Sequence, residues 1–416
     1  MRITKAQLYR DLHRAYLDAR RHKRSRAYQR EFECDMYWQL EHLCDELWSR
    51  TYTPASSTCF IIEDPKKREI FAADFRDRIV HHLYFNYTHE LFERTFIADS
   101  YSCIKNRGTH YGIARLEGHI RSESRNYSRQ CYVMKMDLRG YFMNINRPRL
   151  LEICRSSLVG MRCHRVGGGR KEVWDDVLDF DFLDYLTETI VLLDPVEGCR
   201  RIGWPEDWTS LPESKSLFCS PEDCGLPIGN LTSQLFSNVY LGVLDQWMKR
   251  ELGCRHYGRY VDDFYVVSCN RDWLVSLLPK VRNFLRSELG LCLHEGKMVI
   301  CNVRYGVEYL GAYLKPWRRY VSSQCLSRMK RHIANLEVSV RGMPYDAAAL
   351  RVRNSLCSFL GVLSHYNSYH LRRALFIDSP RVVFARQYGR YSDNLLKFIP
   401  FKRRAKKCSL NQFIMH

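Results

Sequence analysis

Two adjacent carboxylates, Asp262 and Asp263, lie in the stretch RYVDDFYVVS, between aromatic and β-branched residues. Adjacent acids repel each other, so this position costs Coulomb energy unless a cation compensates the charge. A third acid, Asp137, ends the strand-like run CYVMKMD. Carboxylates are ligands that Mg²⁺ prefers, and two such ions can clamp the attacking and leaving oxygens of a phosphoryl transfer. We therefore predict a site for two Mg²⁺ ions, with Mn²⁺ as a substitute. The alternative is a pair of turn acids that only cap a loop.

The surrounding residues predict the elements that hold these acids. Alternation around RYVDDFYVVS predicts a hairpin with the acids at its tip, and TCFIIEDPKKREIF predicts a second hairpin that turns at Asp64 and Pro65. The segment DFRDRIVHH predicts a helix with Asp74 as its N-cap. The first 48 residues and the last hundred predict mainly helices, and residues 151–225 predict helices joined by irregular loops.

Composition narrows the class of partner. The chain has 416 residues, enough for two to four subdomains, and its 65 Lys and Arg against 46 Asp and Glu leave a net charge of +19. A polyanion is the natural partner of such a chain. Its 17 cysteines include no CxxC pair, which favours reduced thiols in a cytosolic protein over a zinc site. The N-terminus has no signal-peptide pattern and no later apolar run is long enough for a membrane span, so we expect neither secretion nor membrane insertion.

Seven sequence blocks follow one another in order between residues 60 and 314. They are KKREIFAADFRDRIVHH, FIADSYSCIKNRGTH, MKMDLRGYFMNI, GLPIGNLTSQ, YVDDF, LHEGK and EYLGAYL. In this order they resemble the reverse transcriptases of the group II intron-like superfamily. The resemblance implies an α+β right-hand polymerase fold, with fingers, a palm built on a ferredoxin-like antiparallel sheet, and a helical thumb. The implied division is a basic helical extension over 1–50, fingers over 51–130, a palm over 131–317 with an insertion at about 151–225, and a basic thumb over 318–416.

The resemblance also assigns roles to individual residues. It implies metal binding by Asp137, Asp262, Asp263 and the main-chain carbonyl of Leu138. Arg68 matches the arginine that grips the incoming triphosphate, with Lys66 or Lys67 as a helper. Arg76 and Arg78 either share that task or pair with Asp74 or Asp77 on the same helix.

Further roles implied by the same resemblance concern the nucleotide and the template. Phe142, five positions beyond Asp137, matches an aromatic gate that excludes ribonucleotides, and otherwise it fills core. Lys297 matches a lysine that approaches the leaving pyrophosphate as a general acid. Ile228 and Gln234 are expected to contact the nascent base pair, and Gly229 to let the backbone approach the template.

The block GLPIGNLTSQ indicates the subtype. Its IGxxxSQ pattern, Ile228 to Gln234, and the segment LLDPVEGCRRIGWPEDWTSLPESKSLF resemble the reverse transcriptases of diversity-generating retroelements. This resemblance implies cDNA synthesis from dNTPs on a template-repeat RNA, with errors at template adenines, for diversification of a target gene. It also implies a small helical accessory variability protein that forms a basic barrel oligomer, and a cytoplasmic enzyme of bacterial or phage origin.

Other functions are also compatible with the sequence. A retron, group II intron or phage-defence reverse transcriptase of ordinary fidelity shares the seven blocks, and an inactive RNA-binding scaffold could retain the fold. An RNA-dependent RNA polymerase would more typically carry GDD and a polar gate, where this chain has Val261 and Phe142.

Overall fold

The computed structural model describes residues 3–21, 26–63, 66–165, 171–174 and 178–401. The chain divides into two compact units, Met1–Ile300 and Cys301–His416. Both units contain helices and strands, and most of the paired strands are antiparallel, as expected for the predicted α+β class. None of the described helices is both long enough and apolar enough to cross a membrane.

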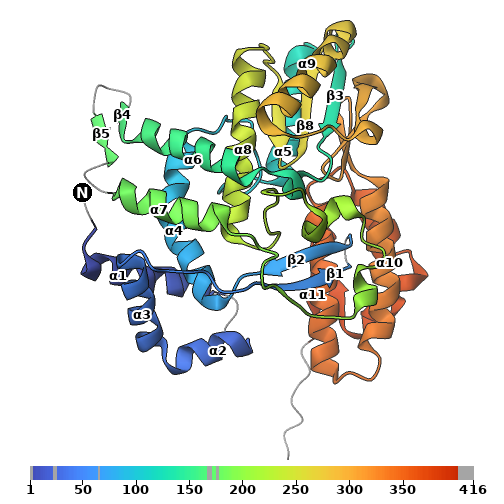
Figure 1. The fold of residues 1–416 in the computed structure, drawn as a ribbon. Helices are drawn as coiled ribbons and strands as arrows, with labels where there is room; N and C mark the ends of the chain where they lie inside the picture. Colours follow the sequence, from blue (N-terminus) through green and yellow to red (C-terminus); the bar gives the residue numbers. More distant parts are fainter. Residues whose placement is uncertain (1–2, 22–25, 64–65, 166–170, 175–177, 402–416) are drawn as a thin grey trace, which may run out of the picture. The chain divides into compact units, whose positions relative to one another are not determined.

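A four-stranded sheet with the order β7-β8-β3-β9 lies mainly in the first unit. Its strands are β7 (Tyr257–Tyr260), β8 (Asp263–Ser268), β3 (Tyr132–Asp137) and β9 (Val299–Asn302). Strand β8 lies antiparallel to both β7 and β3. Helices α5 (Thr109–Glu123), α8 (Leu231–Arg250) and α9 (Arg271–Leu289) pack against the sheet (Figure 1). The predicted hairpin around the paired acids is therefore confirmed.

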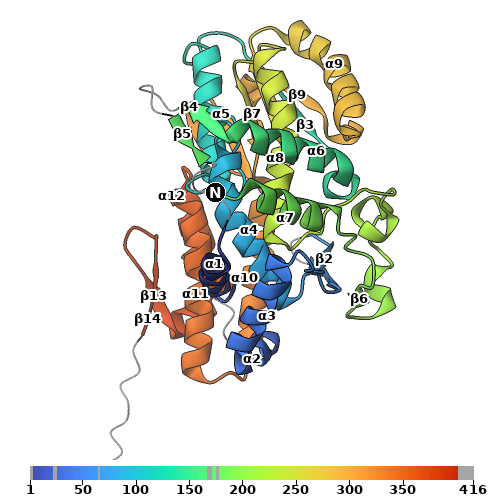
Figure 2. The same ribbon diagram turned by 60° about the vertical axis from the view of Figure 1, so that its left-hand side comes forward.

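A second sheet of this unit joins β1 (Thr58–Ile62), β2 (Arg68–Ala72) and the short β6 (Arg200–Arg201). Strands β1 and β2 are antiparallel, which confirms the second predicted hairpin, although its predicted turn at Asp64 and Pro65 lies outside the described residues. Strand β6 runs parallel to β1 and belongs to the long 151–225 segment (Figure 2). That segment therefore supplies an edge strand besides the helices and loops that its sequence predicts.

Helices complete the core of the first unit. The N-terminal residues form α1 (Lys5–Ala19), α2 (Ala27–Cys34) and α3 (Met36–Trp48), and α1 packs along α4 (Phe75–Glu93). Helices α6 (Arg147–Met161) and α7 (Phe180–Leu192) lie side by side (Figure 1), and the strands β4 (Cys163–Arg165) and β5 (Lys171–Val173) form a small hairpin. Apolar residues of these helices and of the four-stranded sheet form one buried core. Asp74 caps α4 as predicted, because its carboxylate accepts the backbone N–H of Arg76.

The second unit has its own apolar core, formed mainly by α10 (Ser323–Val340) and α11 (Tyr345–Leu363). It begins with the antiparallel sheet β10 (Val307–Tyr309), β11 (Ala312–Lys315) and β12 (Arg318–Val321). Helix α12 (Tyr369–Phe376) and the pair β13 (Gly389–Tyr391) and β14 (Phe398–Pro400) follow. The helices were predicted but the β13–β14 pair was not, and residues 402–416 lie outside the described part.

Candidate active site

The turn between β7 and β8 carries the paired acids in a constrained backbone. Val261 has a φ of 54°, a value that β-branched residues rarely adopt. The N–H of Val261 donates to the hydroxyl of Ser102 at 3.0 Å, and Arg259 Nη1 donates to the Val261 carbonyl at 3.0 Å. These contacts hold the turn from both sides, so Asp262 and Asp263 leave it in one defined conformation.

A buried ion pair lies beneath this turn. Arg259 is fully buried and donates through Nε and Nη2 to the two carboxylate oxygens of Asp245 on α8, at 2.8 and 2.6 Å. The hydroxyl of Tyr257 donates to the same carboxylate at 2.6 Å. A buried ion pair offsets its desolvation cost only when it is well hydrogen-bonded, and this one is. The pair therefore ties the hairpin to α8.

The register of the sheet brings the third acid to the same place. Asp137, the last residue of β3, lies directly opposite Asp263, the first residue of β8. Cross-strand partners have neighbouring side chains on one face of a sheet, so these two carboxylates are in contact range. The carbonyl of Asp137 accepts the His294 N–H at 2.8 Å, and the Arg139 N–H donates to the Cys292 carbonyl at 2.9 Å. These bonds fix the backbone on both sides of Leu138.

Burial and the repulsion between neighbouring carboxylates raise the pKa values of Asp262 and Asp263. Burial, together with the charges of Asp262 and Asp137, raises the pKa of Asp263 to about 7. Burial and the charge of Asp137 also raise the pKa of Asp262. Crowded carboxylates hold protons in this way when no cation compensates their charge. A divalent ion would reverse the effect because it favours the ionised forms.

Lys297 supplies positive charge to the cluster. It ends a short 3₁₀ turn, Glu295–Lys297, and its Nζ lies 2.8 Å from both carboxylate oxygens of Asp137. Half of its side chain is exposed. The structure thus places Lys297 beside the predicted metal-binding acids, as an ammonium group that pairs with one of them.

The three acids have the chemistry of a Mg²⁺ site, because Mg²⁺ prefers carboxylate ligands and the positive charge beside these carboxylates is too small to neutralise them. In the present arrangement, however, no group of three or more His, Cys, Asp or Glu side chains among the described residues is spaced to hold a metal ion. The pairing of Lys297 with Asp137 occupies two of the oxygens. The residues fit the ion chemically, and the Lys297 ammonium would compete with it for the oxygens of Asp137.

The predicted triphosphate residues lie on the neighbouring hairpin. Arg68 begins β2 and is exposed, and its positive charge acts to lower the pKa of Asp262. Lys67 Nζ donates to the Ser210 hydroxyl at 2.7 Å, and Lys66 is exposed. Arg68 is therefore close enough for its positive charge to act on Asp262.

Arg76 and Arg78 have structural partners, but not the predicted ones. Arg76 forms an ion pair with Glu46 on α3, and Arg78 donates from Nε to the Ala73 carbonyl at 2.8 Å. Arg78 also donates to the Tyr28 hydroxyl. The predicted pairing with Asp74 or Asp77 is wrong because Asp74 caps the helix, while Asp77 accepts from Tyr52 and from the Ala55 N–H.

Phe142 is half-buried in the 3₁₀ turn Tyr141–Asn144, which follows β3. Its carbonyl accepts the Leu226 N–H at 2.8 Å, and the neighbouring Tyr141 hydroxyl donates to the Ser237 carbonyl. Its ring packs against a small apolar cluster that Ile228 also borders. Phe142 thus contributes to packing and keeps part of its ring exposed.

Gly229 packs closely against strand β2 of the same chain. It has a φ of 133°, and a Cβ at this position would lie 2.7 Å from the carbonyl oxygen of Phe71. The Phe71 N–H donates to the Ile228 carbonyl at 2.9 Å. The glycine therefore lets this segment pack on β2, a structural reason different from the predicted approach to a template.

Gln234 lies exposed on the first turns of α8. It lines a cavity of about 220 Å³ together with Arg78, His81 and His82 of α4. Within the described part of the chain, His81 Nδ1 is buried without a hydrogen-bond partner. Gln234 therefore borders a small polar cavity that could receive a hydrogen-bonding group.

Sequence reasoning missed two structural anchors of the site. One is the Arg259–Asp245 pair, although an arginine within an apolar strand was a signal. The other is Glu69, which is buried on the same face of β2 as Phe71. Its carboxylate accepts hydrogen bonds from Trp208 Nε1 and the Leu217 N–H, at 2.8 and 2.7 Å. Glu69 thereby docks the 151–225 segment onto the β1–β2 hairpin.

Comparisons with known proteins found a family model that matches part of the chain, and solved structures that are similar to it. The search of curated proteins found no match. Among solved structures, apo telomerase from Candida tropicalis, truncated from its C-terminal domain, aligns with a TM-score of 0.46 and 11% identity over 64% of this chain and 55% of that chain. A further apo telomerase structure from Candida tropicalis aligns with a TM-score of 0.46 and 10% identity over 78% of this chain and 60% of that chain.

Telomerase from Candida albicans, in complex with the TWJ fragment of telomeric RNA, aligns with a TM-score of 0.42 and 9% identity over 80% of this chain and 60% of that chain. The chain thus spans 55 to 60% of the length of these telomerases. Residues 184–314 match the family model described as reverse transcriptase (RNA-dependent DNA polymerase). The predicted α+β class is confirmed by the mixed helices and antiparallel sheets, and the family match is confined to residues 184–314.

Proposed function

We propose that this protein is an RNA-directed DNA polymerase. The observation that carries the proposal is the convergence of Asp137, Asp262 and Asp263 at one end of a sheet, fixed by the β3–β8 register. This end of the sheet lies in a chain whose residues 184–314 match the reverse transcriptase model. The raised pKa values of Asp262 and Asp263 support a site whose negative charge a bound cation would neutralise.

The proposed chemistry is the transfer of a nucleotidyl group. The primer's 3′ hydroxyl oxygen forms a bond to the α-phosphorus of a dNTP, the bond from that phosphorus to pyrophosphate breaks, and the hydroxyl proton passes to solvent water. Reverse transcriptase domains generally use divalent metal ions, and bound Mg²⁺ would stabilise the developing charge on both oxygens. Asp137, Asp262, Asp263 and the Leu138 carbonyl are its proposed ligands.

Other residues have proposed roles in holding the substrates. Arg68, with Lys66 or Lys67, binds the triphosphate, because a guanidinium can bridge phosphate oxygens. Lys297 gives a proton to the leaving pyrophosphate, a role that its position beside Asp137 supports. The exposed part of the Phe142 ring presses on the 2′ position of the sugar and so selects dNTPs. Residues 51–130, 131–317 and 318–416 serve as fingers, palm and thumb, and residues 1–50 as an N-terminal extension.

We further propose the diversity-generating subtype, in which a template-repeat RNA is copied with errors at adenines. The support is the IGxxxSQ pattern together with the setting of Gln234, which borders a polar cavity shared with His81. Ile228, Gly229, Gln234 and Arg68 are the proposed determinants of fidelity. The accessory variability protein is the proposed protein partner, and the high positive charge supports an RNA partner.

The test is primed cDNA synthesis on an RNA template of balanced composition with Mg²⁺, with the RNA and helper protein encoded beside the gene, followed by sequencing. Wild-type protein should extend the primer, and Asp262→Asn/Asp263→Asn protein should not. Errors concentrated opposite adenines support the subtype, whereas faithful cDNA leaves the polymerase and points to a retron-like or defence role. Equal cDNA yields from both proteins would refute the catalytic assignment.

A further inference from the structure

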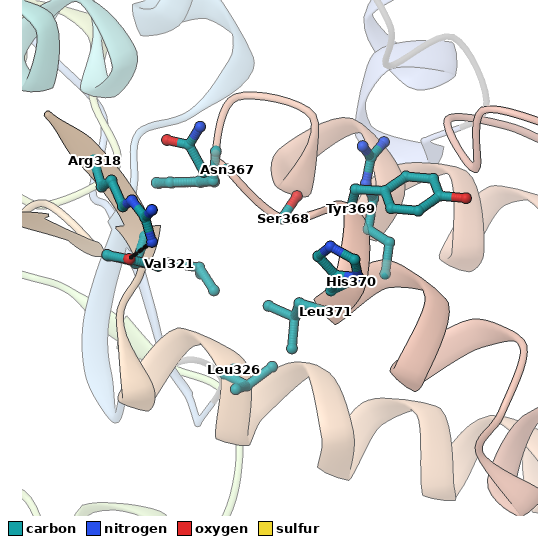
Figure 3. A pocket seen from close by; sticks show the side chains of 11 residues that line it. Arg318, Val321, Leu326, Asn367, Ser368, Tyr369, His370 and Leu371 are labelled. Carbon is teal, nitrogen blue, oxygen red and sulfur yellow. Dashed lines mark hydrogen bonds between the residues drawn. The ribbon is translucent and has the colours of Figure 1, made fainter.

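The second unit contains a cavity of about 810 Å³ between β12 and the start of α12. Figure 3 shows Arg318 and Val321 on one side, His370 and Leu371 on the other, and Leu326 beneath them. The strand and the turn before α12 are joined by two hydrogen bonds. The Asn367 N–H donates to the Arg319 carbonyl at 3.0 Å, and the Arg319 N–H donates to the Asn367 side chain at 3.1 Å. The cavity is therefore built within one unit.

The lining combines rings with positive charge. Arg318 and Arg372 are two of the lining residues, and four further lining residues are aromatic, Tyr320, Tyr366, Tyr369 and His370. None of the 11 lining residues is acidic. The cavity is thus positive and rich in π-faces, which suits a ligand that is both anionic and planar.

Arg372 is a buried part of this positive charge, held in place by the fold. It is only 9% exposed and Nη1 donates to the Leu395 carbonyl at 3.2 Å, while among the described residues its Nε has no hydrogen-bond partner. The first turn of α12 has no side-chain cap, because the Ser368 hydroxyl donates to the Leu363 carbonyl instead. A cation that is nine-tenths buried and an uncapped helix start both favour an anion in this cavity.

The size of the cavity restricts the ligand further. Its volume lies within the range of about 300–1,000 Å³ that small-molecule sites span, so it can receive one or two nucleotides but not a stacked double helix. A base that enters it must first be unstacked and unpaired. Single-stranded RNA offers such bases, and proteins bind them by stacking on aromatic rings and Arg planes.

We propose that this cavity binds an unpaired nucleotide of the RNA that the protein copies, with the base stacked on Tyr320 and the phosphate on Arg318 and Arg372. The inference rests on the proposed RNA-directed polymerase. It adds a second point of RNA contact, built from the C-terminal unit alone and separate from the carboxylates.

The test measures RNA affinity of the full chain, with Asp262→Asn/Asp263→Asn present throughout so that no synthesis occurs. The probes are a fluorescent single-stranded RNA of mixed sequence and a blunt RNA duplex of the same length. We expect Tyr320→Ala and Arg318→Ala each to weaken binding of the single strand about tenfold and to leave duplex binding unchanged. Tyr320→Phe should retain the affinity of the parent protein, because it keeps the ring.

Matched controls separate the cavity from general charge and exposure. Tyr305→Ala removes a tyrosine of the same unit that is 75% exposed, and Arg351→Ala removes an exposed arginine, and neither residue lines the cavity. Both controls should bind like the parent protein, and a 4-thiouridine RNA should crosslink to peptides that contain residues 318–326 or 366–372. Thermal unfolding checks that each variant is folded.

Two results would overturn the inference. One is equal single-strand affinity for the cavity variants and their controls, with crosslinks elsewhere. The other is full displacement of the RNA crosslink by a free mononucleotide at micromolar concentration, which would assign the cavity to a soluble nucleotide. Neither result depends on cDNA synthesis, so failure of the inference and failure of the proposed polymerase are distinguishable.

Discussion

At the scale of single residues, Asp263 carries the clearest electrostatic signature of the site. Burial and two neighbouring carboxylates raise its pKa to about 7, well above the ordinary value of 3.8. The folded protein therefore binds a proton more tightly than the unfolded chain does. The stability that this group contributes is fully present below about pH 4 and is lost as the pH rises through 7.

The Asp263→Asn substitution removes the carboxylate whose ionisation destabilises the folded protein as the pH rises. In EDTA at pH 8 we expect the variant to be more stable than wild type by about 1–3 kcal/mol, a value reduced for screening and coupling. At pH 4 the two proteins should differ little. Thermal unfolding at both pH values measures the effect, and Mg²⁺ should raise the melting temperature of wild type more than that of the variant. A variant that is less stable at pH 8 would contradict the repulsion.

Lys297 is the second residue with a testable local role. Its ammonium lies 2.8 Å from both oxygens of Asp137. If it protonates the leaving pyrophosphate, Lys297→Ala should lower the rate constant of nucleotide addition by about 100-fold at pH 7, with a smaller change in the Kd for dNTP. Single-turnover kinetics separates the two constants. A loss confined to Kd would show that Lys297 only binds the triphosphate.

At the scale of elements, the β7–β8 hairpin depends on one buried ion pair. Arg259→Leu leaves the Asp245 carboxylate buried without its partner, and we expect it to cost about 3–5 kcal/mol in the free energy of unfolding. Asp245→Leu should cost a similar amount. The double variant should be less destabilised than the sum of the two, because it leaves no isolated charge. Urea unfolding of all four proteins gives the cycle, and additive costs would refute the coupling.

Contact between Gly229 and β2 gives a second prediction for an element. Gly229→Ala places a methyl group 2.7 Å from the Phe71 carbonyl oxygen at a φ of 133°, so we expect a loss of about 2 kcal/mol or more. Gly242→Ala in α8 is the matched control, because nothing lies within 4 Å of its new Cβ. The control should be neutral or more stable by up to about 1 kcal/mol. Urea unfolding compares both with wild type, and equal effects would contradict the packing role.

Several elements followed from their sequences alone. The hairpin around Asp262 and the helix capped by Asp74 were predicted correctly, because apolar alternation and capping chemistry act over a few residues. The short strands β6, β13 and β14 were not predicted, because two or three residues carry too little pattern. The partners of Arg76 and Arg78 were also wrong, since Glu46 and Tyr28 come from distant helices.

At the scale of the whole molecule, the net charge of +19 predicts salt-sensitive RNA binding. Binding to single-stranded RNA should weaken with salt at a slope of about −3 to −5 in log K against log salt, which corresponds to about four to seven neutralised phosphates. Titrations between 50 and 300 mM KCl measure the slope. Arg318→Ala should reduce its magnitude by about 0.7 if that guanidinium contacts a phosphate, and a slope near zero would contradict electrostatic binding.

The sequence by itself determined which residues we propose to carry the chemistry. Two acids inside an apolar strand, a third acid at the end of another strand and a strongly basic composition are local facts that already indicated a cation and a polyanion. Only the tertiary structure decided how they meet: Asp137 opposite Asp263, Lys297 against Asp137, and Arg259 buried on Asp245. It alone revealed the aromatic cavity of the second unit. These are contacts between residues far apart in the chain, and their geometry follows from strand register and core packing, which no local pattern encodes.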